Sequence, residues 1–254
     1  VGAEEVMPTV ETRATILLRL NSFLHVQNNA FVNFVRPEVN AFLVELLNHG
    51  ITPLLPKLPA FGKKGPKSKK ILMALAASCN PAAMPEAKMQ CVYKEVRRDL
   101  LDVLDEVKIK PVLLSEYEKS RFLVGTIPLQ ATNILAAFRA GNLARLADAV
   151  AGLSCEAYRT FPEPFGQNHH DFARPYATAV EVAAIMRWML EGSSNVSVDA
   201  LKAKVAARKG DPEAFRLVPE VHACLRDAVA ASTLIARVDL NAAEAMSRAN
   251  DYQH

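Results

Sequence analysis

The sequence is poor in glycine and aromatic residues, and it contains no long uninterrupted apolar run. Ten of its 254 residues are glycine and 7% are Phe, Trp or Tyr, whereas 50% are hydrophobic. This balance favours helices over a sheet of many strands. No apolar run approaches the ~20 residues that a membrane-spanning helix needs. The first residues show no signal-peptide pattern either.

Motifs that bind zinc, phosphates or dinucleotides are also absent from the sequence. The cysteines stand far apart, without a C-x-x-C pair, at positions 79, 91, 155 and 224. This spacing excludes a zinc ribbon and a redox motif and predicts buried free thiols. G-x-S-x-G, P-loop and G-x-G-x-x-G patterns are missing. His169-His170-Asp171 resembles part of a metal site, but no third ligand lies nearby in the sequence, so we predict an exposed loop and no metal.

Helical periodicity covers most of the chain. Apolar residues recur at helical spacing over residues 12–26, 37–47, 68–77, 86–107, 129–158, 178–190, 198–207 and 221–245. Gly141 is a possible break, and three prolines predict a long loop over residues 161–175. Trp188 is predicted to lie in the core with Ile185 and Met189. Without a convincing pair of strands, the predicted fold is all-α, a bundle of long antiparallel helices that forms a single domain over residues 1–254.

Positive charge is concentrated in one short segment, although the net charge of +3 is small. Residues 62–70 contain five lysines, at positions Lys63, Lys64, Lys67, Lys69 and Lys70. Such a density of charge is not buried unpaired, so the segment either faces solvent or meets an anionic partner. Ribosomal RNA, anionic lipid and protein all stay open as that partner. Phe61 is the one neighbouring aromatic residue, which argues against sequence-specific reading of RNA.

Five stretches carry a resemblance to a known family. They read VRPEV with LLNHGITPLLP at residues 35–39 and 46–56, LAD with LSCEAYR at 146–159, PF to RP at 164–175, GDPEAFR with PEVH at 210–222, and VDLNAA at 238–243. In this order and spacing they are similar to the aromatic amino acid lyases and aminomutases, which include the histidine and phenylalanine ammonia-lyases. The resemblance implies the central helical part of that fold. The family's longer chains have further portions before and after this region.

The resemblance also implies which residues should form the family's electrophile. That electrophile, a methylidene-imidazolone, forms when an Ala-Ser-Gly tripeptide cyclises and loses water. Aligned without gaps from Pro56, the tripeptide falls on Lys63-Lys64-Gly65. Because Lys64 has no β-hydroxyl to eliminate, the electrophile cannot form. The expectation is therefore a pseudoenzyme that has no cofactor and no small-molecule substrate.

Other positions that matter in the family have changed as well. Its Asn-Gly-Thr-Gln corresponds to Val124-Gly125-Thr126-Ile127, in which both side-chain amides are lost, and its later tyrosine aligns with Glu213. The arginine that grips the substrate carboxylate is retained as Arg216, and His222 is retained too. Inherited packing explains both retained residues. A binding module that holds a small carboxylate through Arg216 stays open as an alternative.

The predicted function is that of a catalytically inactive, lyase-like accessory subunit in a large multiprotein complex. We expect a mitochondrial location, from the basic pI of 8.7, the absence of Met at position 1 and the reuse of an enzyme fold as a scaffold. The expected partners are other protein subunits, in a respiratory-chain or ATP synthase complex. The alternative is a mitochondrial ribosomal subunit that contacts rRNA through the lysines of residues 62–70.

Overall fold

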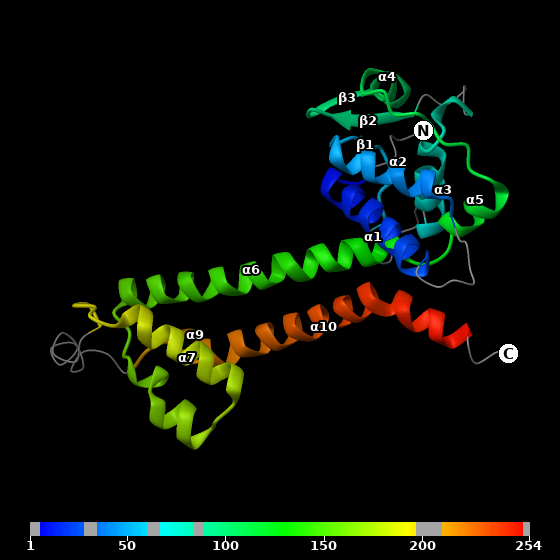
Figure 1. Cartoon of the computed structure of the whole chain (residues 1–254). Helices are drawn as coiled ribbons and strands as arrows, with labels where there is room; N and C mark the ends of the chain where they lie inside the picture. The colour runs from blue at the N-terminus through cyan, green and yellow to red at the C-terminus, as the bar shows by residue number, and fades with distance from the viewer. Residues whose placement is uncertain (1–5, 28–34, 60–66, 84–88, 197–209, 251–254) are drawn as a thin grey trace. The chain divides into compact units, whose positions relative to one another are not determined.

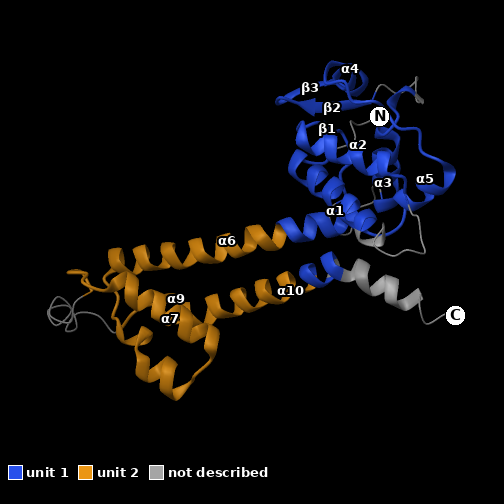
Figure 2. Cartoon of the chain, viewed as in Figure 1, with its two compact units in different colours: residues 1–135, 236–254 blue, residues 136–235 orange. Residues whose placement is uncertain are grey.

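The computed structural model describes residues 6–27, 35–59, 67–83, 89–196 and 210–250 (Figure 1). The chain divides into two compact units, of which unit 1 comprises residues 1–135 and 236–254 and unit 2 comprises residues 136–235 (Figure 2). Two long helices, α6 (Ile127–Tyr158) and α10 (Val218–Asn250), contribute residues to both units. Each unit has a hydrophobic core of its own. The single domain over residues 1–254 stays a prediction.

Unit 1 is built mainly from helices whose apolar faces meet in one core. These helices are α1 (Thr9–Gln27), α2 (Pro37–Asn48), α3 (Ser68–Ser78), α4 (Leu100–Glu106) and α5 (Glu116–Phe122), with a 3-10 turn η1 (Pro81–Ala83). Each of the five helices sends fully buried side chains into the core, among them Ile16, Leu43, Leu75, Leu104 and Phe122. The helices predicted over residues 12–26, 37–47 and 68–77 are thereby confirmed.

The ends of α2 follow directly from the sequence. Pro37 occupies the first helical position, where its missing N–H costs no hydrogen bond. The helix ends at Asn48, and the backbone reverses at Gly50, whose φ of 67° suits a residue without Cβ. The chain then enters a short strand, β1 (Thr52–Pro53).

A small sheet corrects the all-α prediction, which holds only in the broad sense that the chain is mostly helical. Strands β1, β2 (Gln90–Tyr93) and β3 (Val96–Asp99) pair antiparallel in that order. The helix predicted over residues 86–107 was wrong from Gln90 to Asp99, and residues 86–88 lie outside the described residues. The hairpin turns at Lys94 and Glu95, both with positive φ, a conformation that is usually signalled by Asn or Gly. Without that signal the hairpin was not predicted.

Unit 2 packs α7 (Ala177–Leu190) and the first part of α10 against the second half of α6. Its core contains Cys155, Phe165, Val182, Met186 and Val218. The segment predicted as a long loop over residues 161–175 instead contains a 3-10 turn, η2 (Glu163–Phe165), and a π-helix, η3 (Asn168–Ala173). A short helix, α9 (Glu213–Arg216), precedes α10. The helix predicted over residues 198–207 lies outside the described residues.

Glycines in α6 allow close packing and do not break the helix. The possible break at Gly141 does not occur, because α6 is continuous from Ile127 to Tyr158. A Cβ at Gly141 would lie 3.7 Å from Val229 Cγ1, and one at Gly152 would lie 2.8 Å from Met189 Cε. Gly152 therefore leaves room for the Met189 side chain against the helix backbone.

Trp188 is not a core residue, contrary to the prediction. It is 74% exposed, while the buried face of α7 is formed by Ala179, Val182, Ala183, Met186 and Leu190. Three cysteines are buried free thiols, as predicted, whereas Cys224 is exposed. Among the described residues, no helix is long and apolar enough to cross a membrane.

Candidate functional site

The segment that we expect to correspond to the family's electrophile, Lys63-Lys64-Gly65, lies outside the described residues, and only its C-terminal neighbours are described. Lys67 precedes α3 in an extended conformation, and Lys69 lies in the first turn of that helix. Together with Lys70 these side chains face solvent, so their charge is not buried.

Val124 contributes its backbone to the structure of unit 1. Its carbonyl accepts a hydrogen bond from the buried guanidinium of Arg19, which also donates to the carbonyl of Arg121 at 3.4 Å. Burial lowers the pKa of Arg19 to about 10. Val124 itself exposes its side chain. The backbone at Val124, where the resemblance places the family's asparagine, therefore helps to hold the buried Arg19.

Glu213 and Arg216 lie on the surface of unit 2. Both belong to the short helix α9, and both side chains are exposed. Between them Phe215 stacks on Tyr158 of α6, with ring centroids 5.0 Å apart. The helix is thus anchored by its aromatic residue, while its two charged residues point to solvent.

His222 takes part in a buried charge network that the sequence did not reveal. Its Nδ1 lies 2.7 Å from Oδ1 of Asp148, and Arg226 contacts the other carboxylate oxygen of the same residue. Arg226 also donates to Oε1 of Glu181 at 3.1 Å. Asp148 is 2% exposed, and both of its oxygens are satisfied. The network therefore ties α6, α7 and α10 together by charge-assisted hydrogen bonds.

A groove of about 460 Å³ lies next to this network in unit 2. Its apolar wall is formed by Ile185, Met189 and Val229, and its charged side by Asp148, Glu181 and Arg226. Because Arg226 pairs with both carboxylates, its guanidinium is not free to hold an anion. The groove is better suited to an apolar side chain than to an anionic ligand.

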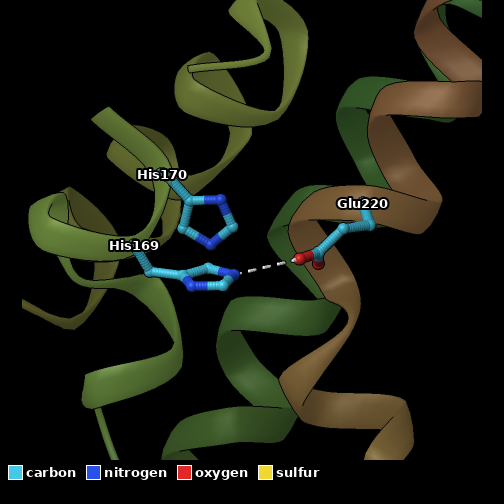
Figure 3. A group of neighbouring side chains, drawn as sticks. All are labelled: His169, His170 and Glu220. Carbon is cyan, nitrogen blue, oxygen red and sulfur yellow. Dashed lines mark ion pairs between the residues drawn. The ribbon is translucent and has the colours of Figure 1, made fainter. Parts of the chain in front are cut away.

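A second group of polar side chains joins η3 to α10. His169 and His170 come from the π-helix, and Glu220 comes from the first turn of α10 (Figure 3). Their potential ligand atoms all lie within 4.8 Å of one another. Sequence reasoning missed this group because it searched for a third ligand near the histidines along the chain, and Glu220 is 50 residues away.

The described elements form a mostly helical protein with one small antiparallel sheet. A family model described as aromatic amino acid lyase matches residues 1–245. The chain therefore belongs to the aromatic amino acid lyase family, and the resemblance inferred from its motifs is confirmed.

Curated relatives of this chain include bacterial histidine ammonia-lyases. That of Streptococcus pyogenes serotype M1 is 27% identical over 232 residues, which are 90% of this chain and 41% of the relative. That of Streptococcus sanguinis strain SK36 is 26% identical over 243 residues, which are 94% of this chain and 43% of the relative. The chain thus spans about two fifths of the length of the curated relatives it matches.

Solved structures of the family share the fold. Tyrosine aminomutase from Streptomyces globisporus is 25% identical with a TM-score of 0.76, over 96% of this chain and 46% of that chain. Phenylalanine ammonia-lyase from the yeast Rhodosporidium toruloides is 24% identical with a TM-score of 0.77, over 94% of this chain and 35% of that chain. The second likeness is one of fold alone.

Proposed function

We propose that this chain is a catalytically inactive member of the aromatic amino acid lyase family and serves as an accessory protein subunit of a larger assembly. The proposed inactivity is supported by the sequence at residues 63–65. Lys64 stands where the family's serine would supply the leaving hydroxyl, and Lys63 replaces the small alanine before it. Neither lysine side chain can undergo the dehydration that creates the electrophile. Val124, where the resemblance places the family's asparagine, has an exposed side chain without the amide that would hold the electrophile.

The assembly role is supported by an exposed apolar stripe on α6. Its four residues, Leu143, Leu146, Val150 and Leu153, are spaced by three, four and three positions and are between 53% and 71% exposed. This spacing places them on one face of the helix, in the pattern that packs against another helix. Contiguous apolar surface of this kind usually marks a contact with a partner. We call these four residues the α6 stripe.

The host that we propose is a mitochondrial multiprotein complex of the respiratory chain or the ATP synthase. The basic pI of 8.7 is in keeping with that location. A mitochondrial ribosome is the alternative host, and the exposed Lys67, Lys69 and Lys70 are in keeping with it, since lysines of this kind can contact RNA phosphates.

Purification of the tagged protein from its own cells, followed by mass spectrometry, tests this function. We expect other protein subunits in fixed stoichiometry. A double variant, Leu146→Asp with Leu153→Asp, should lose them while keeping its helical circular dichroism. Leu17→Asp is the matched control, because Leu17 is an equally exposed leucine on α1 and lies outside the stripe. Recovery of a free homo-oligomer, or retention of the partners by the double variant, would refute the accessory role.

Activity is tested separately by supplying histidine, phenylalanine or tyrosine and following the absorbance of the unsaturated acid that each would release. We expect no product from the native chain. Release of product by the native chain, abolished by Lys64→Ala, would contradict the inactivity that we propose.

A further inference from the structure

The groove of unit 2 is bordered by an exposed tryptophan. The groove lies between α6, α7 and α10, and its apolar lining includes Ala144, Ala149, Ile185 and Met189. One turn after Ile185 on the same helix stands Trp188, which is 74% exposed. Tryptophan is among the residue types that contribute most to binding in protein interfaces. An apolar groove beside an exposed tryptophan therefore indicates a surface on which another protein packs.

This surface lies on the opposite side of α6 from the α6 stripe. Ala144 and Asp148 line the groove and are 4% and 2% exposed, so this side of α6 faces into unit 2. Leu146 and Val150 of the stripe each follow two residues later, and two residues turn a helix by about 200°. The groove and the stripe can therefore contact different elements at the same time.

The rim of the groove carries charges of opposite sign on its two sides. On α6, Arg145 donates to Oδ1 of Asn142 at 2.6 Å and has no carboxylate partner among the described residues. On α7, the side chain of Glu181 is 60% exposed, and its Oε1 accepts from Arg226 at 3.1 Å. A ligand with an acidic group facing Arg145 and a basic group facing Glu181 would complement this rim.

The spacing of the exposed residues on α7 favours a helix as the occupant. Glu181, Ile185 and Trp188 stand at positions i, i+4 and i+7, so they share one face of α7 over about 10 Å. The described residues of unit 2 include no strand, and therefore no sheet edge that an extended segment could join. An amphipathic helix can instead lie along this face and place one apolar side chain in the groove.

We propose that the groove of unit 2 is a second docking site, which receives an amphipathic helix of a partner subunit. The helix inserts one large apolar side chain beside Ile185 and Met189 and packs against Trp188. It carries an acidic residue that faces Arg145 and a basic residue that faces Glu181. The inference rests on the proposed accessory role and extends it, since a chain with two docking faces bridges two elements of its assembly.

A synthetic helix tests the groove on the isolated 254-residue chain. The probe is an alanine-rich peptide of about 15 residues, long enough to be helical in water, with one central leucine. A glutamate three residues before the leucine and a lysine three residues after it lie on opposite sides of the leucine. We expect saturable binding of one peptide per chain, which shifts the NMR signal of the Met189 methyl group and moves the Trp188 emission to the blue.

Variants of the groove and its rim should weaken this binding in a graded way. Ala149→Phe fills the groove and Trp188→Ala removes its aromatic border, and each should lower the affinity by about 10-fold. Arg145→Glu should lower it by about 3-fold, and a peptide with lysine in place of its glutamate should restore it. The matched control is the double variant Leu146→Asp with Leu153→Asp, which should bind the peptide like the native chain. Circular dichroism checks that each variant folds.

Three outcomes would overturn the docking site. They are no shift of Met189 or Trp188 at millimolar peptide, binding that is unchanged in both Ala149→Phe and Trp188→Ala, and binding lost in the control. A Met189 signal that shifts with protein concentration in the absence of peptide would also overturn it, because the occupant would then be a second copy of the chain.

The peptide experiment and the purification from cells fail independently. A native chain that binds the peptide but is recovered without partners would refute the accessory role and leave the groove as a docking site. A chain that ignores the peptide but loses its partners when the α6 stripe is changed would refute the groove and leave the accessory role.

Discussion

The two units bury ionisable groups in different ways. In unit 1, Glu118 completes a capping box with Ser115 three residues before it and also pairs with Arg36 at 2.9 Å. In unit 2, Asp148 is held by His222 and Arg226, which lie 74 and 78 residues away. Glu118 therefore combines a local cap, whose Ser-x-x-Glu pattern stands in the sequence, with a pair to Arg36 that is 82 residues away. Asp148 has no such local partner among the described contacts, and its network depends entirely on how α6 and α10 pack.

The largest effect should come from removing the centre of the unit 2 network. Asp148→Ala leaves Arg226 and His222 without their buried partner, so we expect a loss of about 3–5 kcal/mol in the free energy of unfolding. Urea unfolding followed by circular dichroism measures it. Glu106→Ala is the control, because its pair with Arg98 is solvent-exposed and should contribute little to stability. Equal losses in the two variants would show that the network contributes no more than a surface pair.

Glu118→Gln should have the next largest effect, in unit 1. The substitution weakens the capping box and removes the charge that holds Arg36, and we expect a loss of about 2 kcal/mol. Urea unfolding at pH 7 measures it. Glu116→Gln serves as the control, because Glu116 is exposed and pairs only with Lys119 in the next turn. A loss no larger than that of the control would contradict the role of Glu118.

The pH dependence of stability should also reveal the contribution of Glu118. The hydrogen bonds from Arg36 and Ser115 lower the pKa of Glu118 from 4.5 to about 2 in the folded chain. The unfolded chain then binds the proton first, so this contribution is complete above pH 4.5 and is lost as the pH falls towards 2. Glu118→Gln should flatten that part of the stability profile. An unchanged slope between pH 5 and pH 2 would refute the assignment.

Two glycines of α6 should respond differently to the same substitution. Gly152→Ala places a methyl group against Met189, so the Met189 side chain must shift, and this cost should cancel the gain in helix propensity and leave stability almost unchanged. Gly141→Ala meets only ordinary contact with Val229 and should stabilise the helix by about 0.5–1 kcal/mol. Thermal unfolding of the two variants compares them directly. Similar shifts of the unfolding temperature in both variants would mean that the Met189 side chain does not need the space left by Gly152.

The smallest effect is expected at the only tryptophan of the chain. Trp188 is exposed on α7, so Trp188→Phe should change stability by no more than about 0.5 kcal/mol. Its fluorescence should be quenched by acrylamide as readily as that of free tryptophan. A shielded, blue-shifted emission in the isolated chain would contradict the exposure of this face.

Features that depend on neighbours along the chain could be predicted from the sequence. Pro37 and Gly50 mark the ends of α2 because each acts through its own backbone dihedrals. The apolar spacing of α1, α3, α6, α7 and α10 indicated helices because the 3.6-residue repeat of a helix is set by neighbours along the chain. Family membership was likewise visible in five short motifs, because aligned identities need no knowledge of packing.

Other features were decided by the tertiary structure, because they depend on residues that are distant in the sequence. The hairpin from Gln90 to Asp99 forms where β1 offers a pairing edge, and Trp188 is exposed because the opposite face of α7 meets the core. Glu220 reaches His169 and His170 only through the packing of α10 against η3. Helical periodicity states which residues share a face, whereas long-range packing determines which face is buried and which side chains meet across it.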